Sequence, residues 1–131
     1  MSIVEKLIYR LEKFLLAIHN LSSLTKQAKV NGVTIKHKVS TWRELSRIAN
    51  YTTKEPYTLQ WIDDQVKTND VFYDIGANIG QYSLYAAAQK GAGLRVFCFE
   101  PEAQNFARLF ENIYLNGWGN RIVPFCLAVS N

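Results

Sequence analysis

The second half of the chain alternates short apolar runs with helical segments, and this order constrains the fold more than any other feature. Apolar runs at 71–73, 95–99 and 122–129 are separated by segments of helical character at 80–89 and 102–116. This order is typical of parallel strands joined by right-handed helical crossovers. The sequence therefore predicts an α/β fold that contains three parallel strands.

Residues 1–54 follow a different pattern and are expected to form an accessory region, separate from a domain over 55–131. Apolar residues recur at three- and four-residue spacing over 2–21, which predicts an amphipathic helix. Its apolar face has three candidate partners: the domain, a second subunit or a membrane surface. The polar face mixes acids with bases, and this weakens the membrane interpretation.

A hairpin is predicted after this helix, over 28–39. Asn31-Gly32 is a strong signal for a two-residue hairpin turn. His37 falls on the second strand of the hairpin, where we expect it to be exposed or half-buried rather than catalytic.

Two further helices are predicted before the first apolar run. Thr41 and Glu44 have the spacing of a capping box, which predicts a short helix that ends near Asn50. Pro56 suits the first position of a second helix that ends near Lys67.

Charge and hydropathy bear on partners and location. The chain has 15 Lys and Arg against 11 Asp and Glu, without a dense basic run. No nucleic-acid partner is therefore expected.

No apolar stretch approaches the ~20 residues of a membrane span. Charges interrupt the apolar residues near the N-terminus, which argues against a signal peptide. A cytoplasmic location is expected.

Two cysteines, Cys98 and Cys126, lie in apolar runs without a Cys-x-x-Cys spacing or neighbouring histidines. This pattern does not favour a metal site. Both are expected to be reduced thiols that face the core from adjacent strands.

The segment from Asp74 to Gly80 connects the first predicted strand to a helix, and its composition indicates a ligand-binding turn. Gly76 and Gly80 allow a ligand to approach the backbone without a Cβ in the way. Asn78 tolerates a positive φ at modest cost. The helix that follows directs free N–H groups and its positive end toward the turn, which favours a carboxylate or a phosphate.

Glu100 ends the second predicted strand, 20 residues after Gly80. An acid in this place can accept hydrogen bonds from both hydroxyls of a ribose. The turn and the acid together describe a site for a nucleoside that carries an acidic tail.

NAD and S-adenosylmethionine (SAM) both match that description. The NAD fingerprint is Gly-x-Gly-x-x-Gly, whereas the glycines here are spaced Gly-x-x-x-Gly, with Asp74 two residues before the first. An acid there would repel a pyrophosphate but would attract the amino and sulfonium cations of SAM. The residues favour SAM, and an NAD-linked enzyme is the alternative.

The same stretches resemble the FkbM-type methyltransferases over about residues 55–131. The resemblance is carried by 70–83, 96–101, 111–113, 115–116 and 124–130. It implies a Rossmann-like class I methyltransferase sandwich, and a SAM-dependent enzyme that most often methylates a hydroxyl of a sugar or natural product. The expected partner is a small-molecule or glycan acceptor.

The resemblance also implies which residues contact SAM. The turn would line the methionine end, the acid that follows the second strand would hold the ribose, and the segment after the third strand would lie near the adenine. The implied residues are Asp74, Gly76, Ala77, Asn78, Gly80, Tyr82, Glu100 and Ala128.

The family continues past the third strand into a fourth strand with an acidic motif, and this part follows the position of Asn131. We therefore expect a fold truncated after the third strand, with an N-terminal helix and hairpin extension and without a catalytic base. Such a chain would be inactive in isolation, and it would be either marginally stable or self-associating through its N-terminal helix or exposed sheet edge. A non-catalytic binding module of the same fold is the second hypothesis.

Overall fold

The structure is a computed structural model, and it describes residues 3–4, 7, 10–11, 14 and 24–130. Most of the helix predicted over 2–21 lies outside the described residues and stays a prediction. The residues of this segment that are described are helical, and their apolar side chains are exposed.

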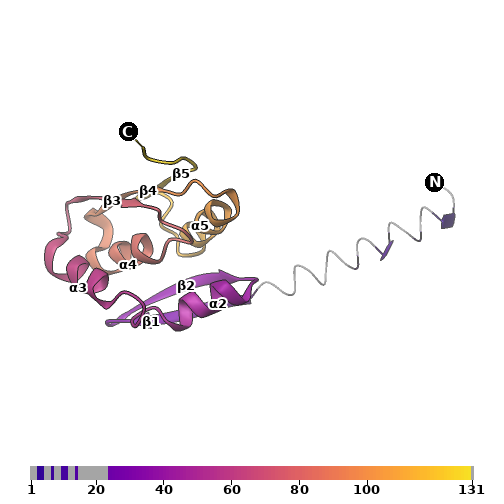
Figure 1. Cartoon of the computed structure of the whole chain (residues 1–131), viewed down its shortest axis with the longest axis horizontal. Helices are drawn as coiled ribbons and strands as arrows, with labels where there is room; N and C mark the ends of the chain where they lie inside the picture. The colour runs from indigo at the N-terminus through magenta and orange to yellow at the C-terminus, as the bar shows by residue number, and fades with distance from the viewer. Residues whose placement is uncertain (1–2, 5–6, 8–9, 12–13, 15–23, 131) are drawn as a thin grey trace.

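The elements form layers (Figure 1). The sheet of β3, β4 and β5 lies on one side of α4 and α5, and the β1–β2 hairpin with α2 lies on the other side. A 3₁₀ turn at Gly91–Gly93 follows α4. In chain order the strands and α-helices are β1 (Leu24–Val30), β2 (Val33–Val39), α2 (Trp42–Ala49), α3 (Pro56–Gln65), β3 (Val71–Ile75), α4 (Gln81–Lys90), β4 (Arg95–Phe99), α5 (Ala103–Leu115) and β5 (Ile122–Phe125).

The three strands predicted in the second half pair in parallel, in the order β3-β4-β5. This confirms the α/β prediction. β5 is shorter than the predicted 122–129, because its neighbour β4 ends at Phe99, which pairs with Phe125. Pro101 lacks an N–H group and cannot extend the ladder.

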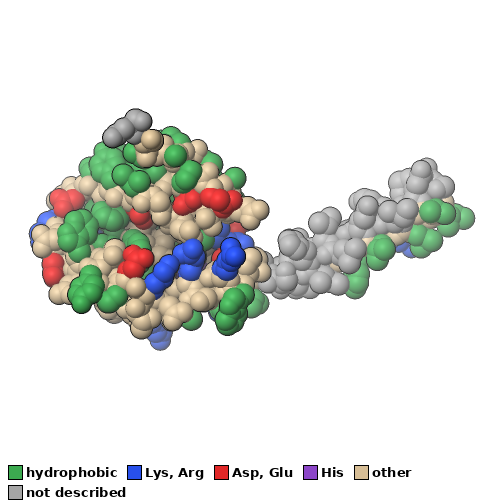
Figure 2. All heavy atoms as spheres, in the orientation of Figure 1, with side chains coloured by type: hydrophobic (Ala, Val, Ile, Leu, Met, Phe, Trp, Pro, Cys, Tyr) green, Lys and Arg blue, Asp and Glu red, His purple; other side chains and the backbone are tan. Residues whose placement is uncertain are grey.

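The two faces of this sheet differ. Val96 and Cys98 point toward the helices and are fully buried. On the opposite face Tyr73 is 61% exposed, and the rings of Phe99 and Phe125 stack with their centroids 5.1 Å apart. Figure 2 shows hydrophobic side chains gathered at this end of the molecule. The described part of the chain thus leaves an aromatic sheet face open, and self-association through this sheet remains a prediction.

The hairpin and the first capping box form as predicted. Asn31 and Gly32 have φ values of 43° and 86°, as a type I′ turn requires. The amide of Glu44 donates to Thr41 Oγ1 at 3.2 Å, and the Glu44 carboxylate accepts from the Thr41 amide at 2.9 Å. The first strand begins at Leu24, earlier than the predicted residue 28.

Asn112 of α5 and Asn116, the residue that caps its C-terminus, bind the free edge of β2. The Lys38 amide donates to Asn112 Oδ1 at 2.8 Å, and the Lys36 amide donates to Asn116 Oδ1 at 2.9 Å. Asn116 Nδ2 donates in return to the Lys36 carbonyl at 2.7 Å. These side-chain amides bond the backbone groups of β2 that a neighbouring strand would otherwise bond. They also join the accessory region to the α/β unit.

The prediction that His37 is exposed or half-buried is wrong, because its side chain is completely buried. The face of β2 that carries Ile35 and His37 packs on α4 and α5, which the hairpin pattern alone did not reveal. Neither ring nitrogen has a hydrogen-bond partner among the described residues. The ring lies 5.6 Å from the ring of Tyr51. Burial lowers the pKa of His37 to about 4.

The cysteine prediction is correct for one residue. Cys98 is buried on β4, and burial raises its pKa to about 12. Cys126 is exposed, because β5 ends one residue before it. Across the described residues there is no cluster of three or more His, Cys, Asp or Glu suited to a metal ion, and no helix with the length and apolar character to cross a bilayer.

Candidate functional site

Parallel pairing brings the glycine turn and Glu100 together at the carboxyl end of the sheet. The turn, residues 76–80, connects β3 to α4. The amides of Gly76 and Ala77 donate to the Phe99 carbonyl at 2.9 and 3.0 Å, so the turn folds over the end of β4. This edge is where ligands bind in open α/β sheets.

The Glu100 carboxylate connects the turn to the segment before α5. Its side chain is only 5% exposed. Oε2 accepts from the Asn78 amide at 2.7 Å, and Oε1 accepts from the Glu102 amide at 2.9 Å. A carboxylate has about four acceptor positions, so these two bonds fix its orientation and leave capacity for two ligand hydroxyls.

Three residues of the turn have positive φ: Gly76 at 79°, Asn78 at 53° and Gly80 at 90°. The prediction for Asn78 is confirmed. An added Cβ at Gly76 would meet nothing within 4 Å, whereas at Gly80 it would lie 2.6 Å from Leu109 Cδ1. Gly80 therefore allows α5 to pack under the turn, a reason that differs from the ligand approach expected from the sequence.

The amides of the turn are all bonded within the chain. Beyond the bonds to Phe99 and Glu100, the Ile79 amide donates to Asn78 Oδ1 at 3.0 Å, and the Gly80 amide donates to the Ala77 carbonyl at 2.8 Å. An anion at this place would therefore be stabilised by the positive end of α4 more than by the turn amides.

Asp74 lies on β3, two residues before the turn, and its carboxylate binds the first turn of α4. Ser83 donates to Asp74 Oδ2 through its hydroxyl at 2.6 Å and its amide at 3.1 Å. Burial raises the pKa of Asp74 against the opposing effect of these bonds, and the nearby Glu100 charge raises it further. Two acids in a desolvated place repel each other, so a cationic ligand would be favoured.

Tyr82 and Ala128 take different positions. Tyr82 is half-buried in the first turn of α4, where burial and a hydrogen bond to Glu55 raise its pKa. Ala128 is exposed beyond the end of β5, and within the described chain no hydrogen bond joins it to the turn or to Glu100.

Two residues that the sequence reasoning missed support the turn from outside it. Asn112 of α5 is fully buried and donates to the Ile79 carbonyl at 3.0 Å. Gln81 Nε2 donates to the Arg47 carbonyl of α2 at 3.0 Å. A polar residue at a core position of an amphipathic helix was the available signal for Asn112, because buried polar side chains need partners.

Replacing Gly80 with Ala is expected to lower the free energy of unfolding by about 2–4 kcal/mol. A positive φ costs a residue with a Cβ about 1–2 kcal/mol, and the contact with the buried Leu109 adds strain. Gly76→Ala is the matched control, since it carries the strain without the contact. Urea unfolding of both variants tests this, and equal losses would contradict the role of Leu109.

Comparisons with known proteins find similarity to a methyltransferase. It is 28% identical over 85 residues to the hexuronic acid methyltransferase AglP of Haloferax volcanii, covering 65% of this chain and 34% of that protein. No protein-family model matches the chain.

Solved structures agree on the fold. P. horikoshii TYW2 in complex with MeSAdo matches with a TM-score of 0.56 at 23% identity, over 79% of this chain and 36% of that chain. M. jannaschii TYW2 in complex with AdoMet matches with a TM-score of 0.54 at 23% identity, over 79% of this chain and 43% of that chain.

The chain spans about a third of the length of AglP and of P. horikoshii TYW2. The chain thus has a Rossmann-like methyltransferase fold and a methyltransferase homologue.

Proposed function

We propose that the chain is the cofactor-binding part of a SAM-dependent methyltransferase of the FkbM type. The observation that carries this proposal is the meeting of Asp74, the glycine turn and Glu100 at the ends of two adjacent parallel strands. The similarity to AglP supports the reaction class.

The residues suit SAM in charge and geometry. Glu100 is held by two backbone amides and has acceptor capacity for the ribose hydroxyls. Asp74, whose pKa is raised by burial, would be stabilised by the ammonium group of SAM. The positive end of α4 would favour the SAM carboxylate. When bound, SAM supplies the methyl group; the chain's own residues orient it and exclude water.

In this proposal the turn residues Gly76, Ala77, Asn78 and Gly80 line the methionine end, Tyr82 lies above it, and Ala128 lies toward the adenine. The acceptor is a hydroxyl of a sugar or natural product. AglP carries hexuronic acid in its name, which supports a sugar. The division into an accessory region over 1–54 and a methyltransferase region over 55–131 belongs to the same proposal.

Calorimetric titration with SAM and S-adenosylhomocysteine tests the cofactor assignment. Glu100→Gln and Asp74→Asn are each expected to weaken binding by about 10- to 100-fold, as for the loss of hydrogen bonds to a charged group. Asp64→Asn, an exposed acid on α3, is the matched control and should leave affinity unchanged. A folded chain that binds NAD instead of SAM, or neither, would refute the assignment, and binding neither would favour the non-catalytic module.

A further inference from the structure

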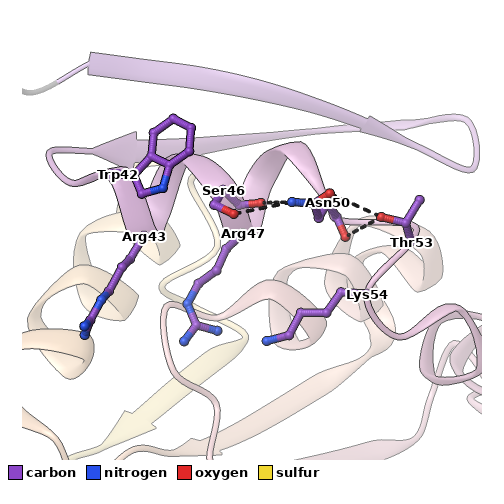
Figure 3. Close-up of a pocket in the computed structure, with 7 residues that line it drawn as sticks. All are labelled: Trp42, Arg43, Ser46, Arg47, Asn50, Thr53 and Lys54. Carbon is purple, nitrogen blue, oxygen red and sulfur yellow. Dashed lines mark hydrogen bonds between the residues drawn. The ribbon is translucent and has the colours of Figure 1, made fainter.

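Three cationic side chains, Arg43, Arg47 and Lys54, gather on α2 and the loop after it; we refer to them as the cationic cluster. Figure 3 shows that Arg43 and Arg47 extend away from the β1–β2 hairpin and that Lys54 extends toward Arg47. They line a hollow of about 400 Å³, within the range of about 300–1,000 Å³ of small-molecule sites. The remaining lining residues are Trp42, Ser46, Asn50 and Thr53.

The cationic cluster has no counter-ion in the described part of the chain. The ion pairs found there join Arg108 to Glu44 and to Glu111, and none involves the cluster. Like charges held near one another repel, and an anion between them would remove this repulsion. Arginine binds carboxylates and phosphates through two parallel N–H groups.

Three acids near the cluster have partners of their own: Glu44 and Glu102, which line a hollow together with Arg43 and Arg47, and Glu55, which follows Lys54 in the sequence. Glu44 accepts from Arg108 Nε at 2.6 Å. Glu102 accepts from the amides of Gln104 and Asn105 at 3.1 and 2.7 Å and caps α5. Glu55 is hydrogen-bonded to Tyr82. These carboxylates accept from other groups, and among the described residues none of them forms an ion pair with the cluster.

The cluster is fixed beside the glycine turn. A second hollow of about 470 Å³ shares Arg43 and Arg47 with the first and reaches Ile79 of the turn. The Arg47 carbonyl accepts from the side chain of Gln81, the first residue of α4, at 3.0 Å. The Tyr51 hydroxyl donates to the Gln81 carbonyl. Figure 2 shows Lys and Arg side chains gathered on this face.

We propose that the cationic cluster is a subsite for the oxyanion of the methyl acceptor, a carboxylate or a phosphate on a sugar-sized molecule. The identity of this ligand as the acceptor rests on the proposed function. The three cations line one hollow, and the acids Glu44 and Glu102 line the adjoining one. The positive charge is thus confined to a small area, which suits a small anion. A nucleic acid requires a longer row of phosphate contacts.

The test is an NMR titration of the full chain with glucuronate, inorganic phosphate and, as a neutral control, glucose. Glucuronate or phosphate is expected to shift the signals of Arg43, Arg47 and Lys54, and glucose is not. The double variant Arg43→Gln/Arg47→Gln should weaken anion binding at least ~10-fold, as expected for two lost charge-assisted contacts. Arg95→Gln is the matched control, because it removes the same type of charge from the start of β4, at the opposite end of the strand from the turn.

Each outcome decides the proposal. Binding of glucuronate identifies a carboxylate acceptor, and binding of phosphate alone identifies a phosphorylated one. No binding of either anion, or equal weakening by Arg95→Gln, overturns the subsite. A separate titration with an RNA oligonucleotide also decides: shifts of these signals by the RNA, without shifts by glucuronate or phosphate, overturn the subsite. SAM titrations on the same proteins separate the two proposals: Glu100→Gln should weaken SAM binding and spare anion binding, and the arginine double variant should do the reverse.

Discussion

Replacing Asn112 with Ala is expected to lower the free energy of unfolding by about 2–4 kcal/mol. Its side chain accepts from the Lys38 amide at 2.8 Å and donates to the Ile79 carbonyl at 3.0 Å. Asn112 itself is completely buried. Its removal leaves both backbone groups without their partner. An unsatisfied buried group costs about 1–3 kcal/mol, and the bond to the Lys38 amide, which is partly buried, contributes the smaller share.

Asn116→Ala is the control for this prediction. Asn116 makes the same kind of bond to β2 one helical turn later, but its contacts with Lys36 are exposed, so water can replace them. We expect a loss of about 1 kcal/mol or less. Urea unfolding measures both variants, and similar losses at the two positions would contradict the importance of burial at Asn112.

The Asn112 variant should also report on the candidate site. Asn112 connects β2 to the turn, so its loss should increase hydrogen exchange at the amides of Ile79 and Gly80 as well as in the hairpin. Faster exchange in the hairpin alone would mean that the turn holds its conformation without the bond from Asn112.

The stability of the chain is expected to fall as the pH is lowered from about 6.5 toward 4, because of His37. Burial lowers the pKa of this residue to about 4 from an ordinary value of 6.5. Between these values the unfolded chain binds the proton and the folded chain does not, so acid favours unfolding. One pKa unit corresponds to about 1.4 kcal/mol, which gives a loss of about 2–3 kcal/mol by pH 4.5.

His37→Leu isolates this effect, with His37→Gln as a second variant that does not titrate. The lowered pKa of Glu44 makes its contribution to the free energy of unfolding decrease in acid. The raised pKa of Asp74 makes its contribution increase. Both contributions are present in every protein compared and cancel in the difference. Urea unfolding from pH 7 to 4.5 should show that the stability of wild type relative to His37→Leu declines with acid. A constant difference would show that His37 is protonated without cost in the folded state.

Local sequence patterns predicted most elements of this chain. The turn at Asn31-Gly32 and the capping box of Thr41 and Glu44 formed as predicted, because each depends on a few neighbouring residues. The parallel sheet was predictable as well, since strand–helix–strand order leaves few arrangements. The meeting of the turn with Glu100 follows from the same rule.

Contacts between distant elements were not predictable in this way. The burial of His37 depends on the packing of the hairpin on α4 and α5. Glycine is needed at position 80 because Leu109, 29 residues later, packs against it. The position of the cationic cluster near the turn depends on a contact between α2 and α4, in which the Gln81 side chain donates to the Arg47 carbonyl.

The sequence by itself determined the local conformations, the strand order along the chain and the chemical types of the candidate cofactor residues. Only the tertiary structure decided which faces became buried, which glycine supports packing, and that α2 lies beside the turn. The physical reason is the distance along the chain over which each interaction acts. Turns, caps and hydrophobic periodicity act over a few residues, whereas burial and side-chain pairing across elements depend on how all the layers pack together.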